Sequence, residues 1–241
     1  MLFLLYINDI VLSSDVFKFT LFADDTSLFY SHNDMIEATN IINLELSKIS
    51  QWLAANKLSL NVGKSKLMIF TNRKIKSTKK PPETDVTLAL NRNIETQDDD
   101  EFLNNICLNG QILEEVDHAN YLGVIIDNKL KWNFHIDSIN LKLSKGTGLL
   151  AKIRHFVPSD VLRSLYFSFI NPYIDYNLLN WGMAPITNID LVNKKLKKIV
   201  RIISFKDSDT LCTPLYKKLN ILPLDKSIEL RQAKHMWKLH K

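Results

Sequence analysis

Cysteine is scarce in this sequence: Cys107 and Cys212 are the two in 241 residues. They stand far apart, without the paired spacing of a zinc site or the density of a disulfide framework. We therefore exclude a disulfide-stapled domain and expect two buried thiols in a reducing compartment. The predicted location is intracellular, in the nucleus or the cytoplasm.

Long apolar runs are also missing, which excludes a membrane-spanning helix and argues against a membrane as partner. The first residues, "MLFLLYINDI", are apolar, but they lack a basic region and a cleavage site, and Asn8 and Asp9 interrupt them. A signal peptide is therefore not predicted. Residues 2–12 instead predict the last turns of a buried helix. No internal repeat is visible.

The sequence contains ordinary globular amounts of apolar residues, 46%, and of charged residues, 24%, enough for one large domain or two small ones. The charge is unevenly placed. Residues 141–241 carry 18 Lys and Arg against 7 Asp and Glu, whereas residues 1–140 carry 13 against 19. This asymmetry fits a metal-binding part joined to a polyanion-binding part, although solvated helix faces would also produce it.

Alternation of apolar and polar residues predicts a β-hairpin at residues 17–31, "FKFTLFADDTSLFYS". Asn33 and Asp34 can cap a following helix at 34–55, in which apolar residues recur every three or four positions. We expect the helix to lie on one face of a sheet built from 17–31 and three later segments. These segments are 66–71, 106–116, with a turn signal at Asn109–Gly110, and 121–127.

Residues 72–105 are polar, with a basic block followed by an acidic block. They offer too little apolar surface to offset the entropy of ordering, so we predict a disordered insertion. Beyond about residue 135, amphipathic helical patterns follow one another to the end of the sequence. The predicted fold class is therefore α+β, with a sheet-and-helix part followed by an all-helical part.

Asp24 and Asp25 stand side by side at the tip of the predicted hairpin. A polar turn would explain one aspartate, because aspartate tolerates turn geometry. Two adjacent carboxylates repel each other, however, and the flanking aromatic residues predict partial desolvation, which strengthens the repulsion. A divalent cation such as Mg²⁺ would remove it. Chemistry alone leaves the turn and the metal site about equally supported.

A series of motifs resembles the reverse transcriptases of non-LTR, LINE-like or jockey-type, retrotransposons. "LFADDTSLF" resembles their F-A-D-D catalytic hairpin, and "LFLLYINDI" the helix before it. "WLAANKLSLNVGKSKLMIF" resembles the next helix and its lysine-bearing strand, "YLGVIIDNKLKWNFHI" the primer-grip hairpin, and "SLYFSFINPYIDYNLLNWG" the thumb. The order of these motifs is more specific than any one of them.

The resemblance implies the C-terminal part of a right-hand polymerase palm at 1–134, an antiparallel sheet with a packed helix, and a thumb-like helical region at 135–241. It implies RNA-directed DNA synthesis with a two-metal Mg²⁺ site that Asp24 and Asp25 help to form. Lys64 matches the lysine beside the leaving pyrophosphate, although a solvated lysine after a turn is the other interpretation. The implied partners are an RNA template, a DNA primer and a dNTP.

Tyr121, Leu122 and Gly123 match the primer grip, where glycine lets the backbone approach the primer terminus; a strand bulge is the alternative. Lys194, Lys195, Lys198 and Arg201 lie on one face of a predicted helix and would bind backbone phosphates. The aromatic residues Tyr173, Tyr176 and Trp181 could stack on bases, but core packing is the better-supported interpretation of them.

The family also takes a metal-binding aspartate from a strand upstream of this hairpin, and neither Asp9 nor Asp15 matches it. We therefore expect an incomplete metal site, a missing upstream palm and fingers segment as partner, and little activity from this chain alone. Two hypotheses follow. One is an RNA-directed DNA polymerase or a fragment of one, and the other is a non-catalytic nucleic-acid-binding remnant.

Overall fold

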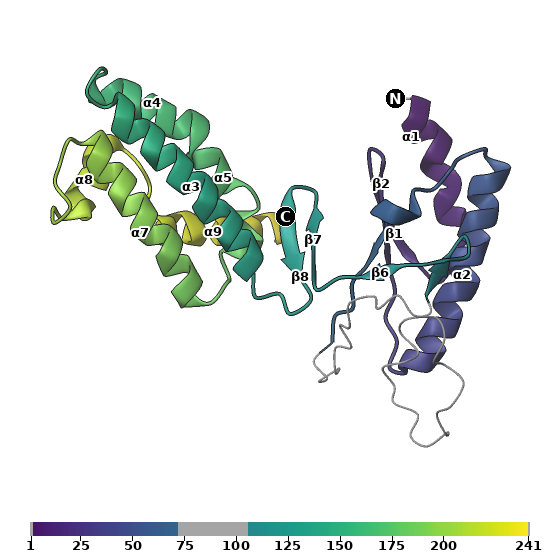
Figure 1. The fold of residues 1–241 in the computed structure, drawn as a ribbon. Coiled ribbons are helices and arrows are strands. Elements are labelled where there is room, and N and C mark those ends of the chain that lie inside the picture. Colours follow the sequence, from purple (N-terminus) through teal and green to yellow (C-terminus); the bar gives the residue numbers. More distant parts are fainter. Residues whose placement is uncertain (1, 72–105, 241) are drawn as a thin grey trace, which may run out of the picture. The chain divides into compact units, whose positions relative to one another are not determined.

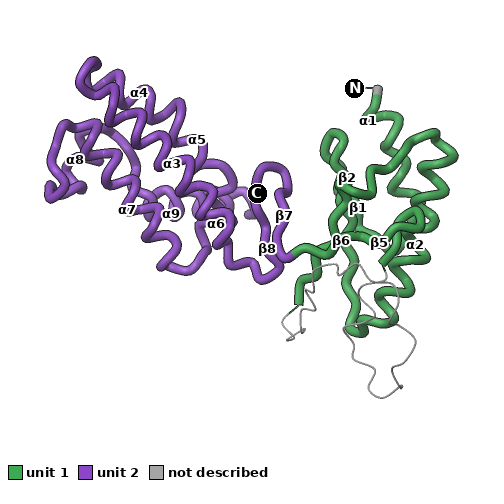
Figure 2. The backbone as a smooth tube through the Cα atoms, in the orientation of Figure 1, with its two compact units in different colours: residues 1–116 green, residues 117–241 purple. Residues whose placement is uncertain are grey.

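The computed structural model describes residues 2–71 and 106–240. The chain forms two compact units, residues 1–116 and residues 117–241 (Figure 2). The division falls between Val116 and Asp117, whereas the sequence led us to place the palm–thumb boundary after residue 134. The predicted insertion at 72–105 lies outside the described residues. Within the described residues, no helix has the length and apolar character needed to cross a membrane.

The first unit places one long helix beside short strands (Figure 1). Its elements are α1 (Leu2–Ile7), the 3₁₀ turns η1 (Asn8–Ser13) and η2 (Val62–Lys64), α2 (Met35–Ala55), β1 (Lys18–Phe22), β2 (Asp25–Phe29), β3 (Lys66–Leu67), β4 (Cys107–Leu108), β5 (Gln111–Ile112) and β6 (Glu114–Glu115). The mixture of helix and strand agrees with the predicted α+β class.

Helix α2 begins and packs as its sequence predicts. The Asp34 carboxylate accepts the N–H of Glu37 at 2.8 Å and so caps the first turn. The apolar residues of α2 point into a core that also takes residues from α1, η1, β1 and β4. Its fully buried members are Ile7, Ile10, Phe17, Leu46, Ile49, Leu53, Ile106 and Leu108.

The predicted single sheet is wrong for the described residues, which form separate two-stranded pairs: β1–β2, β3–β6, β4–β5 and β7–β8. The β3–β6 pair is parallel, and β3 has two residues where a strand over 66–71 was predicted. Alternation predicts an extended chain but not its partner, because pairing depends on backbone groups that tertiary contacts bring together. The Asn109–Gly110 turn is confirmed, with positive φ values of 52° and 75°.

The prediction that residues 2–12 form a buried helix is wrong in part. They form α1 and most of η1, and Ile7 and Ile10 are buried against α2. The apolar side chains on the other side of the two turns are exposed; they are Phe3, Leu4, Leu5, Tyr6, Val11 and Leu12. A short helix that packs against one other helix buries one of its sides and leaves the other side in solvent. The apolar composition of a segment does not show how many elements pack against it.

The second unit consists of a β-hairpin and packed helices (Figure 1). Its elements are β7 (His118–Tyr121), β8 (Val124–Asp127), α3 (Asn133–Ile153), α4 (Ser159–Phe169), α5 (Asn171–Asp175), α6 (Leu178–Trp181), α7 (Ile186–Ile203), α8 (Cys212–Leu219) and α9 (Leu224–Leu239). The predicted change to helices near residue 135 is confirmed, and α3 continues through Gly146 and Gly148.

Trp181 belongs to the core of this unit and is 0% exposed. The same core takes residues from α3, α4, α7 and α8, among them Leu143, Leu162, Val192, Ile199 and Leu215. Core packing is therefore confirmed for Trp181. Tyr173 and Tyr176 are exposed instead. Cys212 is buried and Cys107 half-buried, both as free thiols, so a buried position is confirmed for the first of them.

Two glycines of this unit allow a matched test of the packing. A Cβ on Gly182 would lie 2.4 Å from the Leu178 carbonyl oxygen and 3.1 Å from Ile228 of α9, whereas a Cβ on Gly148 would meet nothing within 4 Å. Gly182→Ala should lower the free energy of unfolding by about 1–3 kcal/mol through overpacking. Gly148→Ala should raise it by about 0.5–1 kcal/mol, because alanine favours a helix interior. Urea unfolding measures both; equal effects would contradict the packing described.

Candidate nucleic-acid and metal sites in two hairpins

The aspartate pair lies at the tip of the β1–β2 hairpin. Phe22 pairs with Asp25, so Ala23 and Asp24 form a two-residue turn. Ala23 has a φ of 52°, in the left-handed region that favours glycine. Backbone strain of this kind is concentrated at functional sites, where the local geometry matters more than its cost in stability. The turn places Asp24 at the tip of the hairpin and Asp25 at the start of β2.

Both carboxylates are exposed, so the predicted partial desolvation is wrong. The neighbouring aromatic residues do not cover them, because Phe22 and Phe29 themselves face solvent. No described residue forms a hydrogen bond or ion pair with either carboxylate. The carboxylate oxygens of Asp24 and Asp25 are therefore accessible to a cation from solvent. The described residues contain no cluster of three or more His, Cys, Asp or Glu side chains that could hold a metal ion.

Lys64 lies in the same unit, at the end of η2. Its N–H is bound twice by Asn61, at 3.1 Å by the carbonyl and at 3.2 Å by the side-chain oxygen, and its side chain is exposed. These bonds fix the backbone of the turn and leave the ammonium group in solvent. Among the described residues, no hydrogen bond or ion pair joins Lys64 to Asp24 or Asp25.

The residues predicted as the primer grip form the tip of the β7–β8 hairpin. Tyr121 pairs with Val124, and Leu122 and Gly123 between them have φ values of 48° and 81°. Two consecutive positive φ values define the tight hairpin turn that suits strand twist. The predicted strand at 121–127 is therefore interrupted by a turn, and the bulge interpretation of Gly123 is wrong. Glycine is required here for its φ.

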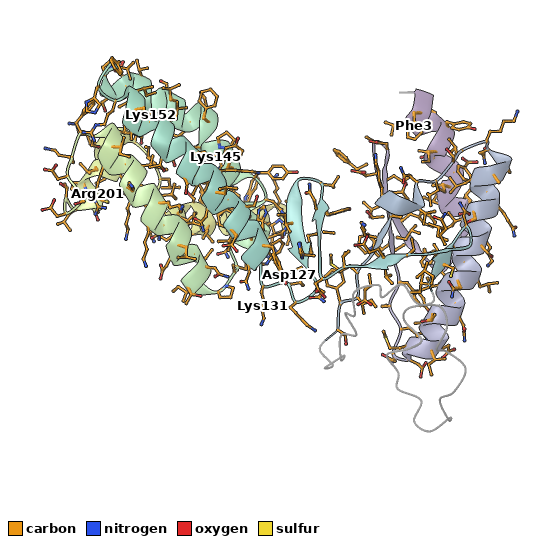
Figure 3. The ribbon with its side chains drawn as sticks, viewed as in Figure 1. Phe3, Asp127, Lys131, Lys145, Lys152 and Arg201 are labelled. Atoms are coloured by element: carbon orange, nitrogen blue, oxygen red, sulfur yellow. The ribbon has the colours of Figure 1, made fainter. Side chains whose placement is uncertain are left out.

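The buried carboxylate of Asp127 ties the end of this hairpin to the loop that leads into α3 (Figure 3). Its oxygens accept the N–H groups of Lys129 at 3.2 Å, Lys131 at 3.0 Å and Trp132 at 2.7 Å. Three such bonds stabilise a buried negative charge. Asp127 also holds the loop that leads into α3. It was not among the residues predicted from the sequence, although an aspartate in a turn commonly accepts the N–H two residues further on, as Asp127 does from Lys129.

His135 of α3 makes a second contact with this hairpin. Its Nδ1 accepts the N–H of Ile125 on β8 at 3.3 Å, and its ring lies edge-on to both Trp132 and Trp181. Because Nδ1 accepts a hydrogen bond, the ring is neutral with its proton on Nε2. Burial, and secondarily the charge of Lys142, lowers the pKa of His135 below its ordinary value. The surroundings therefore favour the uncharged form of His135, whose Nε2 is buried without a hydrogen-bond partner among the described residues.

Of the four basic residues predicted to share one face of α7, two are exposed and two also make contacts within the fold. Lys194 and Lys198 are exposed. Lys195 is half-buried and donates a hydrogen bond to Ser144 of α3, and Arg201 donates to the carbonyl of Thr210 at 2.8 Å, so both also hold the fold together.

Helix α3 contributes to the same surface. It runs beside α7 in the same direction, with Asn188 bonded to Asn133 near the start of both helices (Figure 1). The Lys195–Ser144 bond joins the two helices, and Lys145 and Lys152 of α3 (Figure 3) are exposed, as Lys194 and Lys198 of α7 are. We call these four lysines the basic face. Its two α3 members were not predicted from the sequence, because α3 there looks like a separate amphipathic helix.

Three curated proteins match the chain. The RNA-directed DNA polymerase from mobile element jockey of Drosophila funebris is 24% identical over 187 residues, 76% of this chain and 18% of that protein. The probable RNA-directed DNA polymerase from transposon BS of Drosophila melanogaster is 21% identical over 223 residues, 91% of this chain and 22% of that protein. The chain is a distant relative of these jockey-like reverse transcriptases.

The jockey polymerase of Drosophila melanogaster gives a third match, 23% identical over 76% of this chain. The chain thus spans about a fifth of the length of the curated reverse transcriptases it matches. No protein-family model and no solved structure matches it significantly. The resemblance found in the motifs is therefore confirmed at the level of a distant relationship to reverse transcriptases.

The pKa of His135 predicts how the stability of the helical unit depends on pH. The unfolded chain takes up this proton near pH 6.5 and the folded chain at lower pH, so stability falls as the pH drops below about 6.5. One proton gives a slope of at most about 1.4 kcal/mol per pH unit. Urea unfolding from pH 7.5 to pH 5, followed by tryptophan fluorescence, measures it.

The control for this prediction is His155, an exposed histidine of the same unit. His135→Gln should flatten the dependence between pH 7.5 and pH 5, and His155→Gln should leave it as in the wild type. A pH dependence that survives His135→Gln would mean that another group is responsible.

Proposed function

We propose that this chain is part of a reverse transcriptase of a jockey-like mobile element, with residues 1–134 as the C-terminal part of its palm and residues 135–241 as its thumb. The observation that supports this most is the similarity to RNA-directed DNA polymerases over 76–91% of the chain. The two family motifs expected at hairpin tips also lie at hairpin tips. The substrates would be an RNA template, a DNA primer and a dNTP.

Asp24 and Asp25 fit one side of a Mg²⁺ site. Their oxygens are of the hard type that Mg²⁺ prefers, and they are exposed and without a partner among the described residues. Mg²⁺ commonly binds one or two carboxylates and fills its remaining positions with water and phosphate oxygens. When bound, the metal would neutralise charge on the reacting phosphates. Lys64 would add a positive charge toward the leaving pyrophosphate.

The nucleic acid would lie on the basic face and at the Leu122–Gly123 turn. Lys145, Lys152, Lys194 and Lys198 can contact backbone phosphates by charge, which needs no base recognition. An alternative use of Lys152 is to complement the dipole of α3, since it lies in the last turn of that helix. Binding to nucleic acid distinguishes the two uses.

A second function is favoured by a specific observation. The described residues contain no cluster of three or more potential metal ligands, and polymerase chemistry of this kind uses two metal ions. The chain by itself would then bind nucleic acid without extending a primer. Localisation inside the cell, in the nucleus or the cytoplasm, is part of both proposals.

We expect the chain to bind nucleic acid weakly and without sequence preference, with an affinity that falls steeply with salt. Each phosphate contact contributes about −0.7 to −0.9 to the log–log slope. Lys194→Gln or Lys198→Gln should weaken binding and reduce the slope by about 1 each. Fluorescence anisotropy with a labelled oligonucleotide at several salt concentrations measures both quantities.

The matched control for the binding measurement is Lys226→Gln. It removes the same charge from α9, where Lys226 pairs with Glu229 at 2.8 Å. This variant should bind as the wild type does. Binding that does not change with salt, or an equal loss in all three variants, would contradict a role for the basic face.

We expect the purified chain to show no primer extension on an RNA template, and Mg²⁺ to bind it weakly through Asp24 and Asp25. Supplying the upstream palm and fingers of a jockey-like polymerase should restore extension, and Asp24→Ala should then lower it by at least about 10²-fold. Asp9→Ala, which removes another exposed carboxylate of the same unit, is the control. Robust extension by the chain alone, or by the Asp24→Ala variant, would contradict this assignment.

A further inference from the structure

Tyr176 connects the Leu122–Gly123 turn to the helical unit across a long stretch of sequence. It follows α5 directly, and its hydroxyl donates a hydrogen bond of 2.5 Å to the carbonyl oxygen of Leu122, 54 residues earlier in the chain. Its ring also lies against one side of Gly123, where an added Cβ would lie 3.6 Å from the ring carbon Cε1. One side chain therefore contacts both residues of the turn.

The backbone of Tyr176 is held in turn by the core. Its carbonyl oxygen accepts the indole N–H of Trp181 at 3.0 Å, and Trp181 is fully buried. Trp181 packs edge-on against His135, which binds the N–H of Ile125 on β8. These contacts run from the turn through Tyr176, Trp181 and His135 to Ile125, which belongs to the same hairpin. The position of the turn is thus fixed from both sides.

The tyrosine contributes more to the position of the turn than to core packing. Its side chain is largely exposed, at 54% for the residue, so little apolar surface is buried by its ring. Leu122 has a φ of 48°, which is strained for a bulky residue. A hydrogen bond to its carbonyl oxygen holds this peptide in the orientation that the turn needs. A phenylalanine could make the same ring contact but not this bond.

We propose that Tyr176 is a positioning residue for the Leu122–Gly123 turn and, through the turn, for binding a duplex with a recessed 3′ end. The second half rests on the proposed function, in which this turn is the primer grip. At a recessed end the sugar–phosphate backbone would pass close to the exposed backbone of Gly123, while the ring of Tyr176 occupies the direction that a Cβ would take there. Tyr176 decides where that backbone lies.

The test of the first half is hydrogen exchange in the full chain. Tyr176→Phe should speed exchange of the amides in residues 121–124 by about 3- to 10-fold, as the loss of one hydrogen bond predicts. Exchange in α3 and α7 should remain as in the wild type. Tyr173→Phe is the matched control, because it also removes a tyrosine hydroxyl, from α5, that forms no hydrogen bond to the turn. The ring of Tyr173 lies instead 5.0 Å from the Lys142 ammonium group. Unchanged exchange in Tyr176→Phe would overturn the positioning role.

The second half is tested by binding to two DNA duplexes of equal length, one with a recessed 3′ end and one blunt. The wild type should prefer the recessed duplex, and Tyr176→Phe should lose that preference while binding the blunt duplex unchanged. A variant that weakens both equally would show a merely structural role and overturn the proposal. If the wild type has no preference, the primer-grip function fails, whereas the exchange experiment still decides whether Tyr176 positions the turn.

Discussion

The buried carboxylate of Asp127 is the constraint on which the second unit depends. Burying a carboxylate is costly unless hydrogen bonds satisfy its oxygens. The three N–H groups that donate to Asp127 must therefore stay in place. They belong to a loop in which Leu130 and Trp132 have positive φ values of 52° and 64°. The carboxylate thus stabilises a strained loop, and that loop joins β8 to the start of α3.

This constraint explains why the β7–β8 hairpin belongs to the helical unit and pairs with no other described strand. Asp127, His135 and Tyr176 each bind a different part of the hairpin or of the loop after it. The turn at its tip is held in one position while Gly123 remains exposed. A surface that is both exposed and fixed suits the binding of an extended polymer, since little entropy is lost on binding.

The β1–β2 hairpin of the first unit also has a tight two-residue turn, but different side chains stand at its tip. A two-residue turn again includes a non-glycine residue of positive φ, Ala23, and the exposed groups at the tip are carboxylates. Alanine and leucine at positions that favour glycine lower the stability of the folded chain. Both hairpins therefore combine a turn of positive φ with an exposed residue at the tip, Asp24 in one and Gly123 in the other.

The sequence by itself determined the local elements. The cap at Asp34, the amphipathic pattern of α2 and α7, and the turn at Asn109–Gly110 depend on neighbouring residues, and the structure has all of them. The order of motifs was also sufficient to identify the distant relationship to reverse transcriptases. Tertiary structure alone decided which strands pair and which neighbours share a surface, namely α3 with α7 and Tyr176 with the Leu122–Gly123 turn. These choices depend on contacts between residues about 50 positions apart, and no short sequence pattern encodes such contacts.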